Sequence, residues 1–266
     1  MPYETVLVED RDRVRTITLN RPEKLNALTD QLANEMIDAI EEADRADDVN
    51  VILLTGGGRG FCAGLDLTQR LNGATSRVEP SRWERLDDLG WVGRQALVMQ
   101  GASKPVVAAI NGAAAGAGLS IALAADVRVM AQGARITSGY ARRGLNPDGG
   151  MSWFLPRMVG PTRAADLIFT ARDVAAEEAL SLGIVAAVYP DESFREDAQA
   201  YAARLAANAP IGMSNSKRLL SESFRNDLTT QLKRELTLIR RAFESEDVRE
   251  GLQAFVEKRQ PVFRGR

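Results

Sequence analysis

Two wholly apolar runs, each followed by a glycine-rich segment, constrain the fold of this chain most. The first reads VILLT at 51–55 and precedes GGGRGFCAGLDL, and the second reads PVVAAI at 105–110 and precedes NGAAAGAG. Apolar runs of this length without alternation are typical of parallel strands that are buried on both faces. We therefore expect buried strands that lead into glycine-rich turns at their carboxyl ends, where ligands bind in α/β folds.

Segments with helical spacing separate the predicted strands. Thr29 is placed to cap a helix in which Leu32, Met36 and Ile40 recur at helical spacing. A second helical period covers 86–99, and a tightly packed helix is expected after the second glycine-rich turn. The alternation of strand and helix predicts an α/β core with parallel strands.

The chain changes character after the apolar run 185–189, where the strand patterns end. Residues 191–258 have almost entirely helical patterns, with a break at 208–210. We predict an α/β core over residues 1–190 and a C-terminal helical region over residues 191–266. The amphipathic late helices predict an oligomer, because their apolar faces would otherwise stay in water.

Composition excludes several classes of chemistry. The 34 basic and 36 acidic side chains give a formal net charge of −2, so no basic field favours nucleic acid. Histidine is absent from the sequence, which excludes a Ser-His-Asp triad and imidazole metal ligands. The single cysteine, Cys62, excludes an intrachain disulfide and a thiolate zinc cluster. We expect no metal site.

The apolar stretches carry no membrane or targeting pattern. Residues 1–10 contain charges and no apolar h-region. The longest apolar stretch, 105–125, is interrupted by Asn111 and by many glycines. We expect no membrane span and a cytoplasmic protein.

The glycine-rich segments do not match nucleotide-binding motifs. GGGRGF lacks the Gly-Lys-Ser/Thr end of a phosphate loop, and Ile121 stands where a dinucleotide fingerprint needs its last glycine. Taken alone, 112–125 is typical of a helix whose backbone packs closely in the core. Taken together, the two turns could direct one backbone N–H group each at a single carbonyl oxygen. That arrangement is an oxyanion hole, which needs no histidine.

Five motifs in order carry a resemblance to the crotonase, or enoyl-CoA hydratase/isomerase, superfamily. They are RPEKLNAL at 21–28, VILLTGGGRGFCAGLDL at 51–67, KPVVAAINGAAAGAGLSIALAADVRVM at 104–130, GLNPDGGMSWFLPRMVG at 144–160 and EGLQAFVEKRQPVF at 250–263. The resemblance implies an α/β fold with a crotonase-like ββα superhelix core and a C-terminal helical trimerisation region. It also implies an acyl-CoA thioester substrate, as in fatty acid metabolism, and a homotrimer or hexamer. No separate cofactor is implied, because coenzyme A is part of the substrate.

The resemblance also implies which residues form the site. The two oxyanion N–H groups belong to Leu65 and Ala117, and a main-chain donor tolerates alanine where glycine is common. The positions that correspond to contacts with the substrate and its coenzyme A are Lys24, Leu25, Ala63, Gly64, Asp66, Leu67, Gly116 and Tyr140. Lys24 and the C-terminal Arg264 are candidates for contacting the anionic phosphates of coenzyme A.

The catalytic acids are where this sequence departs from typical hydratases. Ser120 and Tyr140 stand where those enzymes carry two glutamates, and Asp148 remains in the turn Asn-Pro-Asp-Gly-Gly. In this respect the chain resembles the ring-epoxide isomerases of phenylacetate breakdown, which carry a working aspartate at this position. We expect an enoyl-CoA isomerase in which Asp148, facing an apolar acyl pocket, is the acid/base. The alternatives are an enoyl-CoA hydratase of low activity, another enolate reaction such as decarboxylation, and a non-catalytic acyl-CoA-binding protein.

Several other side chains have a functional and a structural interpretation. Trp83, Trp91 and Trp153 could wall a pocket for an aromatic acyl group, although each is more often core or interface. Arg142 and Arg143 bring positive charge near the predicted site or form a solvated pair. Cys62 is expected to be a buried small residue and not a nucleophile.

Overall fold

Two sheets form the core of the protein. The computed structural model describes residues 3–68, 82 and 86–266. The larger sheet contains, in spatial order, β1 (Val6–Arg11), β2 (Val14–Leu19), β3 (Val51–Gly56), β5 (Val106–Ile110), β7 (Val127–Ala131) and β10 (Ala187–Tyr189). The smaller sheet contains β4 (Gly60–Cys62), β6 (Ala113–Ala115), β8 (Arg135–Thr137) and β9 (Val174–Ala175).

The larger sheet is parallel except at its first hairpin. β1 pairs with β2 in antiparallel register, and their turn places Asp12 and Arg13 at φ values of 54° and 60°. From β2 through β3, β5 and β7 to β10 every pairing is parallel, with Leu53 opposite Val107 in the centre. Strands in the middle of such a sheet are covered on both faces, which is why β3 and β5 are wholly apolar in sequence.

The smaller sheet arises because three core strands are each followed by a short second strand. β4 follows β3, β6 follows β5, and β8 follows β7, in each case after a short turn. A helix then follows each of the later pairs, so the ββα unit that the resemblance implied is confirmed. The sequence patterns predicted only turns for β4 and β6, because both strands are three residues long, β4 follows three glycines and an arginine, and the alanines of β6 have low strand propensity.

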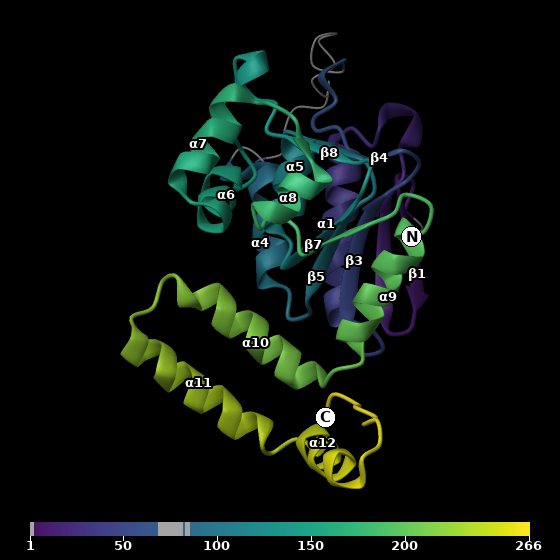
Figure 1. Ribbon diagram of the computed structural model, residues 1–266, viewed down its shortest axis with the longest axis vertical. Helices are drawn as coiled ribbons and strands as arrows, with labels where there is room; N and C mark the ends of the chain where they lie inside the picture. The colour runs from purple at the N-terminus through teal and green to yellow at the C-terminus, as the bar shows by residue number, and fades with distance from the viewer. Residues whose placement is uncertain (1–2, 69–81, 83–85) are drawn as a thin grey trace.

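Helices cover the sheets. Those of the core are α1 (Asp30–Arg45), α4 (Gly90–Gly101), α5 (Ala117–Ala124), α6 (Met151–Val159), α7 (Pro161–Thr170) and α8 (Ala176–Ser181), as Figure 1 shows. The predicted cap of the first helix is confirmed, since the hydroxyl of Thr29 accepts a hydrogen bond from Leu32 N at 3.2 Å. α4 begins at Gly90, four residues after the predicted helical period starts.

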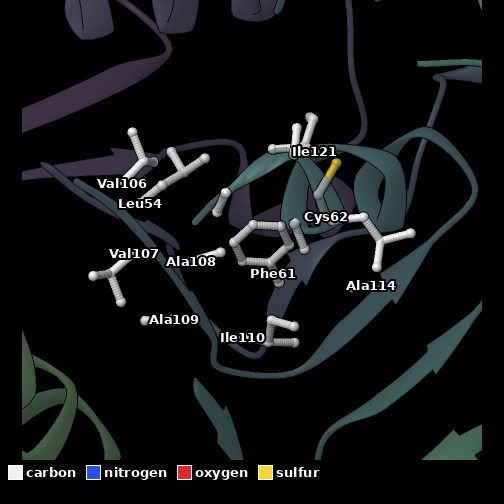
Figure 2. Packing of buried hydrophobic residues seen from close by; sticks show 14 of the residues in the cluster. Leu54, Phe61, Cys62, Val106, Val107, Ala108, Ala109, Ile110, Ala114 and Ile121 are labelled. Carbon is white, nitrogen blue, oxygen red and sulfur yellow. The ribbon is translucent and has the colours of Figure 1, made fainter. Parts of the chain in front are cut away.

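The core is packed tightly where the glycine-rich helix crosses the strands. Phe61 lies among side chains of β3, β5 and α5, and its exposed fraction is 0% (Figure 2). Every residue of α5 is buried. A Cβ atom at Gly118 would lie 2.1 Å from the carbonyl oxygen of Cys62, so only glycine allows this approach. Close backbone packing in the core is therefore one structural role of residues 112–125.

The last part of the chain is helical, as predicted. It contains α9 (Phe194–Ala206), α10 (Pro210–Ser223), α11 (Leu228–Ala242) and α12 (Glu246–Glu257). α9 packs on the larger sheet, where Gln199 donates a hydrogen bond to the carbonyl oxygen of Arg11 at 3.1 Å. α10 and α11 lie side by side below the core in Figure 1, and α12 follows them. Within this helical region, α9 packs on the larger sheet, whereas α10, α11 and α12 lie below the core in Figure 1.

Candidate active site

A cavity of about 300 Å³ opens where the first loop and the two glycine-rich turns meet. Its walls contain nearly all the residues that the sequence predicted for the site. The lining residues are Lys24, Ala27, Ala63, Gly64, Leu65, Asp66, Leu67, Thr68, Ala115, Gly116, Ala117, Gly139, Tyr140, Arg143, Leu145 and Asp148. Leu25 does not line the cavity; its carbonyl oxygen accepts a hydrogen bond from Ala63 N at 2.9 Å and so holds the wall in place.

The two turns approach each other more closely than side chains would allow. Gly64 has φ +91°, and a Cβ atom there would lie 2.7 Å from the carbonyl oxygen of Ala115. The same position lies 3.6 Å from the backbone nitrogen of Ala117. Gly116, with φ +52°, precedes α5 and turns the chain into the helix. Glycine at 64 and 116 therefore brings the backbone of one turn against the first residue of α5.

Each turn presents one backbone N–H group that lacks an acceptor among the described residues. A parallel bridge uses the neighbours of Leu65: Leu28 N donates to Gly64 O at 2.7 Å, and Asp66 N donates to Leu28 O at 2.9 Å. The N–H group of Leu65 itself therefore has no acceptor among the described residues. Ala117 is the first residue of α5, where an N–H group has no partner within the helix. The predicted oxyanion donors thus lie on adjoining turns.

Two asparagines, which the sequence interpretation missed, hold the glycine-rich loop 56–61: Asn26 is buried and Asn111 is partly buried. The side-chain nitrogen of Asn26 donates to the carbonyl oxygens of Gly57 and Gly60 at 3.0 and 2.8 Å. Asn111 accepts a hydrogen bond from Gly56 N at 3.1 Å and donates to Gly60 O at 3.2 Å. A single asparagine in a loop has no spacing pattern, so the printed sequence offers no signal for this role beyond the surrounding motifs.

Asp66 holds the loop beside Leu65, the first of the two predicted oxyanion residues. Its carboxylate accepts hydrogen bonds from the Thr68 hydroxyl at 2.6 Å and from Arg21 at 3.1 Å. The Thr68 hydroxyl and then the Arg21 guanidinium hold the pKa of the Asp66 carboxyl below its usual range, although burial opposes them. Arg21 also donates to the carbonyl oxygen of Ala27. Asp66 is therefore ionised and joins the Lys24–Ala27 loop to the oxyanion turn.

Tyr140, Ser120 and Asp148 form a polar cluster, of which Tyr140 and Asp148 line the cavity and Ser120 lies buried behind it. The Tyr140 hydroxyl donates to Oδ1 of Asp148 at 2.5 Å. Ser120 Oγ donates to the main-chain carbonyl of Asp148 at 2.9 Å and lies 3.2 Å from the Tyr140 hydroxyl. Burial, and next the hydrogen bond to Asp148, raise the pKa of Tyr140, so its hydroxyl stays protonated. The sequence interpretation described Tyr140 mainly as a pocket wall and Ser120 as a packed helix residue.

The environment of Asp148 is more polar than predicted. Asp148 is exposed, one carboxylate oxygen is bonded to Tyr140, and Arg143 lies on the same cavity wall. The turn 147–150 displays this side chain at the rim because Gly149 and Gly150, with φ values of 60° and 87°, reverse the chain just after it. The described residues therefore do not surround Asp148 with an apolar acyl pocket.

The remaining candidates divide into cavity and framework residues. Arg143 lines the cavity and donates to Gly139 O at 2.8 Å, whereas Arg142 points to Asp173, at 3.8 Å. Burial raises the pKa of the Cys62 thiol to about 12, so Cys62 is not a nucleophile, as expected.

None of the tryptophans in the described part of the chain lines this cavity. Trp91 donates to Asp30 at 2.9 Å and so joins α4 to α1. Trp153 stands on α6, where Arg157 stacks on its ring. Trp83 lies outside the described residues.

The described residues contain neither a metal-binding cluster nor a helix that could span a membrane. No group of three or more His, Cys, Asp or Glu side chains there could hold a metal ion. No helix there is long and apolar enough to cross a membrane.

Comparison with known proteins agrees with this geometry. The family model described as enoyl-CoA hydratase/isomerase matches residues 9–266. The chain is 37% identical over 268 residues to the 1,2-epoxyphenylacetyl-CoA isomerase of Escherichia coli, with 99% of each chain covered. It is 33% identical to the short-chain-enoyl-CoA hydratase of Clostridium acetobutylicum, with 97% of each covered. The crystal structure of enoyl-CoA hydratase from Bacillus anthracis matches with a TM-score of 0.90 at 31% identity, covering 99% of this chain and 100% of that one.

The chain therefore belongs to the enoyl-CoA hydratase/isomerase family, the crotonase superfamily, and it is a family enzyme that acts on acyl-CoA. Relatives of similar identity are named as isomerases and as hydratases.

Proposed function

We propose that this protein is an enoyl-CoA isomerase that shifts a double bond through a thioester enolate, with Asp148 as the acid/base. One observation carries the proposal. The cavity that holds two free backbone N–H groups has one carboxylate on its opposite wall, and a hydroxyl pair where hydratases carry glutamates.

The N–H groups of Leu65 and Ala117 supply the first requirement of this reaction. A proton next to a neutral thioester is weakly acidic, and the charge that develops on the carbonyl oxygen must be stabilised. Two preorganised donors at that oxygen favour the enolate over the ground state. The glycine contact between the turns sets the separation of the donors, so no side chain has to move during the reaction.

Asp148 supplies the second requirement. In a 3-enoyl-CoA, its carboxylate takes a proton from C2, and the electron pair of that C–H bond spreads into the dienolate. The carboxylic acid then returns the proton to C4, which gives the conjugated 2-enoyl thioester. The carboxylate is regenerated, and no water, oxidant or other co-reactant is consumed. A positioned general base contributes about a hundredfold to ten-thousandfold to such a step.

The polar cluster supports isomerisation over hydration. Addition of water across a double bond needs one group to activate the water and a source of the second proton. Tyr140 remains protonated and its hydrogen is used in the bond to Asp148. Ser120 likewise donates its one proton to a main-chain carbonyl. Asp66, the other carboxylate among the described lining residues, is bonded to Thr68 and Arg21, so Asp148 remains there for proton transfer, and one such group suffices for an isomerase.

A non-catalytic acyl-CoA-binding protein is the second candidate. The observation in its favour is the replacement of both hydratase glutamates, at Ser120 and Tyr140. On either function we propose that coenzyme A is bound as part of the substrate and that no other cofactor is needed. Lys24, which is exposed on the cavity wall, would contact its phosphates, and Arg264 could do so from a neighbouring copy.

We also propose that the C-terminal helices form the interface of a homotrimer, or of a hexamer built from two trimers. Apolar side chains recur at helical spacing along α11 and are between 49% and 74% exposed: Leu228, Leu232, Leu236, Ile239 and Phe243. Such a stripe is costly in water and is continuous with exposed apolar residues of α10 and α12. Light scattering during gel filtration gives the mass of the assembly, and a monomer would overturn this part of the proposal.

The reaction is tested by offering the purified protein two substrates. We expect 3-hexenoyl-CoA to gain the absorbance of a conjugated enoyl thioester, and trans-2-hexenoyl-CoA to be hydrated slowly or not at all. Rapid hydration of the 2-enoyl substrate would favour a hydratase. Tight binding of both without turnover would favour the binding protein.

A further inference from the structure

The two carboxylate oxygens of Asp148 have different surroundings. Oδ1 accepts the 2.5 Å hydrogen bond from the Tyr140 hydroxyl. Oδ2 accepts no hydrogen bond from any described residue, and Asp148 forms no ion pair there. The carboxylate is thus held by one oxygen and open at the other, on the wall of the cavity that contains the oxyanion donors.

The protons of the cluster can be assigned by counting donors. Tyr140 has one hydroxyl hydrogen, and it points to Oδ1 because a carboxylate has none to donate. The contact between Tyr140 and Ser120, at 3.2 Å, is therefore one in which only Ser120 could donate. Ser120 has a shorter acceptor in the main-chain oxygen of Asp148, at 2.9 Å. Every polar hydrogen of the cluster is accordingly directed at Asp148, its carboxylate or its backbone.

The tyrosine that directs this hydrogen bond is itself fixed. Tyr140 is 6% exposed and follows the strand β8 at the point where Gly139 packs beside Gly116. A charge-assisted hydrogen bond from a rigid donor restricts the rotation of the carboxylate, which otherwise turns freely at its terminal torsion. The side chain of Asp148 needs such a restraint because it stands exposed at the rim.

We propose that Tyr140 is a positioning residue whose hydroxyl holds Oδ1 of Asp148, so that Oδ2 is the atom that carries the proton between C2 and C4. The inference rests on the proposed isomerase function. The hydroxyl does not touch the reacting carbons; it sets the direction of Oδ2.

The test compares Tyr140→Phe with the wild type on 3-hexenoyl-CoA, with Tyr189→Phe on β10 as the matched control for losing one phenol hydroxyl. We expect kcat to fall about tenfold to a hundredfold in Tyr140→Phe, because the lost bond is charge-assisted, with KM changed less than twofold. Tyr189→Phe is expected to leave both constants unchanged.

Two further readouts separate positioning from packing. The 13C chemical shift of the Asp148 carboxyl, at one neutral pH and with no substrate present, is expected to differ between Tyr140→Phe and the wild type. Replacement of Tyr140 by 3-fluorotyrosine, which keeps the ring and its hydroxyl, is expected to restore the activity that Tyr140→Phe loses. The other charged groups on this cavity, Lys24, Asp66 and Arg143, are the same in all variants.

The inference is overturned if the Asp148 carboxyl signal is the same in the wild type and Tyr140→Phe, if 3-fluorotyrosine at position 140 is as impaired as Tyr140→Phe, or if KM rises while kcat is kept. Asp148→Asn, assayed in parallel, distinguishes the two proposals. Full activity in Asp148→Asn overturns the assignment of the base, and with it this inference. An inactive Asp148→Asn beside an unimpaired Tyr140→Phe overturns only the role of Tyr140.

Discussion

Ser120 lies three residues after Ala117 on α5, so one turn of helix joins the proposed oxyanion donor to the residue that holds the backbone of the proposed base. The N–H group of Ala117 is at the helix start, and Ser120 Oγ donates to the main-chain oxygen of Asp148 at 2.9 Å. Residues three apart share a face of a helix. Helix geometry therefore fixes the point at which the Asp148 backbone is held relative to the N–H group of Ala117.

Replacing Gly64 by alanine tests the contact between the two turns. The new Cβ atom would lie 2.7 Å from Ala115 O, at a φ of +91° that alanine tolerates poorly, so the turns must separate. We expect kcat to fall about a hundredfold to a thousandfold, as when one oxyanion donor is lost. The expected loss of stability is about 1–3 kcal/mol. Kinetics together with thermal unfolding measure both effects.

Gly101→Ala, at the end of α4, is the matched control for Gly64→Ala. Its new Cβ atom would meet no atom within 4 Å, so activity should be kept. Wild-type activity in Gly64→Ala would mean that the spacing of the turns is not part of catalysis.

Gln95 is expected to lower the stability of the protein. Its side chain on α4 is fully buried, and neither amide atom has a hydrogen-bond partner in the part of the chain that the structure describes. The nitrogen lies 3.0 Å from where a Cβ atom at Gly149 would be, just behind the Asp148 turn. Methionine has a similar shape and no buried amide, so we predict that Gln95→Met raises the free energy of unfolding by about 1–3 kcal/mol. Denaturant titration measures this, and destabilisation together with lost activity would show that the amide has a partner during the reaction.

The C-terminal tail is expected to loosen only in strong acid. Glu250 accepts hydrogen bonds from Arg259 at 2.6 and 2.8 Å and from Val262 N at 2.7 Å, which lower the pKa of Glu250 to about 2. Because the folded-state pKa is lowered, these bonds stabilise the tail above the ordinary value of 4.5 and are lost as the pH falls from there to about 2. A 13C titration of the carboxyl group measures the midpoint, and Arg259→Gln should move it towards 4.5. A midpoint near 4.5 in the unmodified protein would contradict the prediction.

Much of the fold was predictable because buried strands and amphipathic helices have strong periodic patterns. Wholly apolar runs marked β3 and β5, and Thr29 marked the start of α1. The second sheet could not be found in this way, since its strands are only two or three residues long and β6 consists of three alanines. Their pairing depends on where the longer strands place them. The packing of α9 on the sheet likewise depends on tertiary contacts, which the hydrophobic pattern of α9 alone does not specify.

The site was predictable where main-chain groups form it and less so where side chains meet. The glycine-rich turns and the family motifs pointed to Leu65 and Ala117, which the structure brings onto adjoining turns. The hydrogen bond between Tyr140 and Asp148 spans eight residues of irregular chain, which no periodicity describes. The exposure of Asp148 and the role of Asn26 follow from loop conformations at positive φ, which the sequence alone does not fix.

The central claim is that one carboxylate, Asp148, performs the proton transfer. The most direct measurement compares the conversion of 3-hexenoyl-CoA to its conjugated isomer by the wild type and by Asp148→Asn, which keeps the shape of the side chain and removes its basicity. We predict that kcat falls by about a hundredfold to ten-thousandfold while the affinity for the acyl-CoA is kept. An Asp148→Asn protein that isomerises the substrate at the wild-type rate would contradict the account.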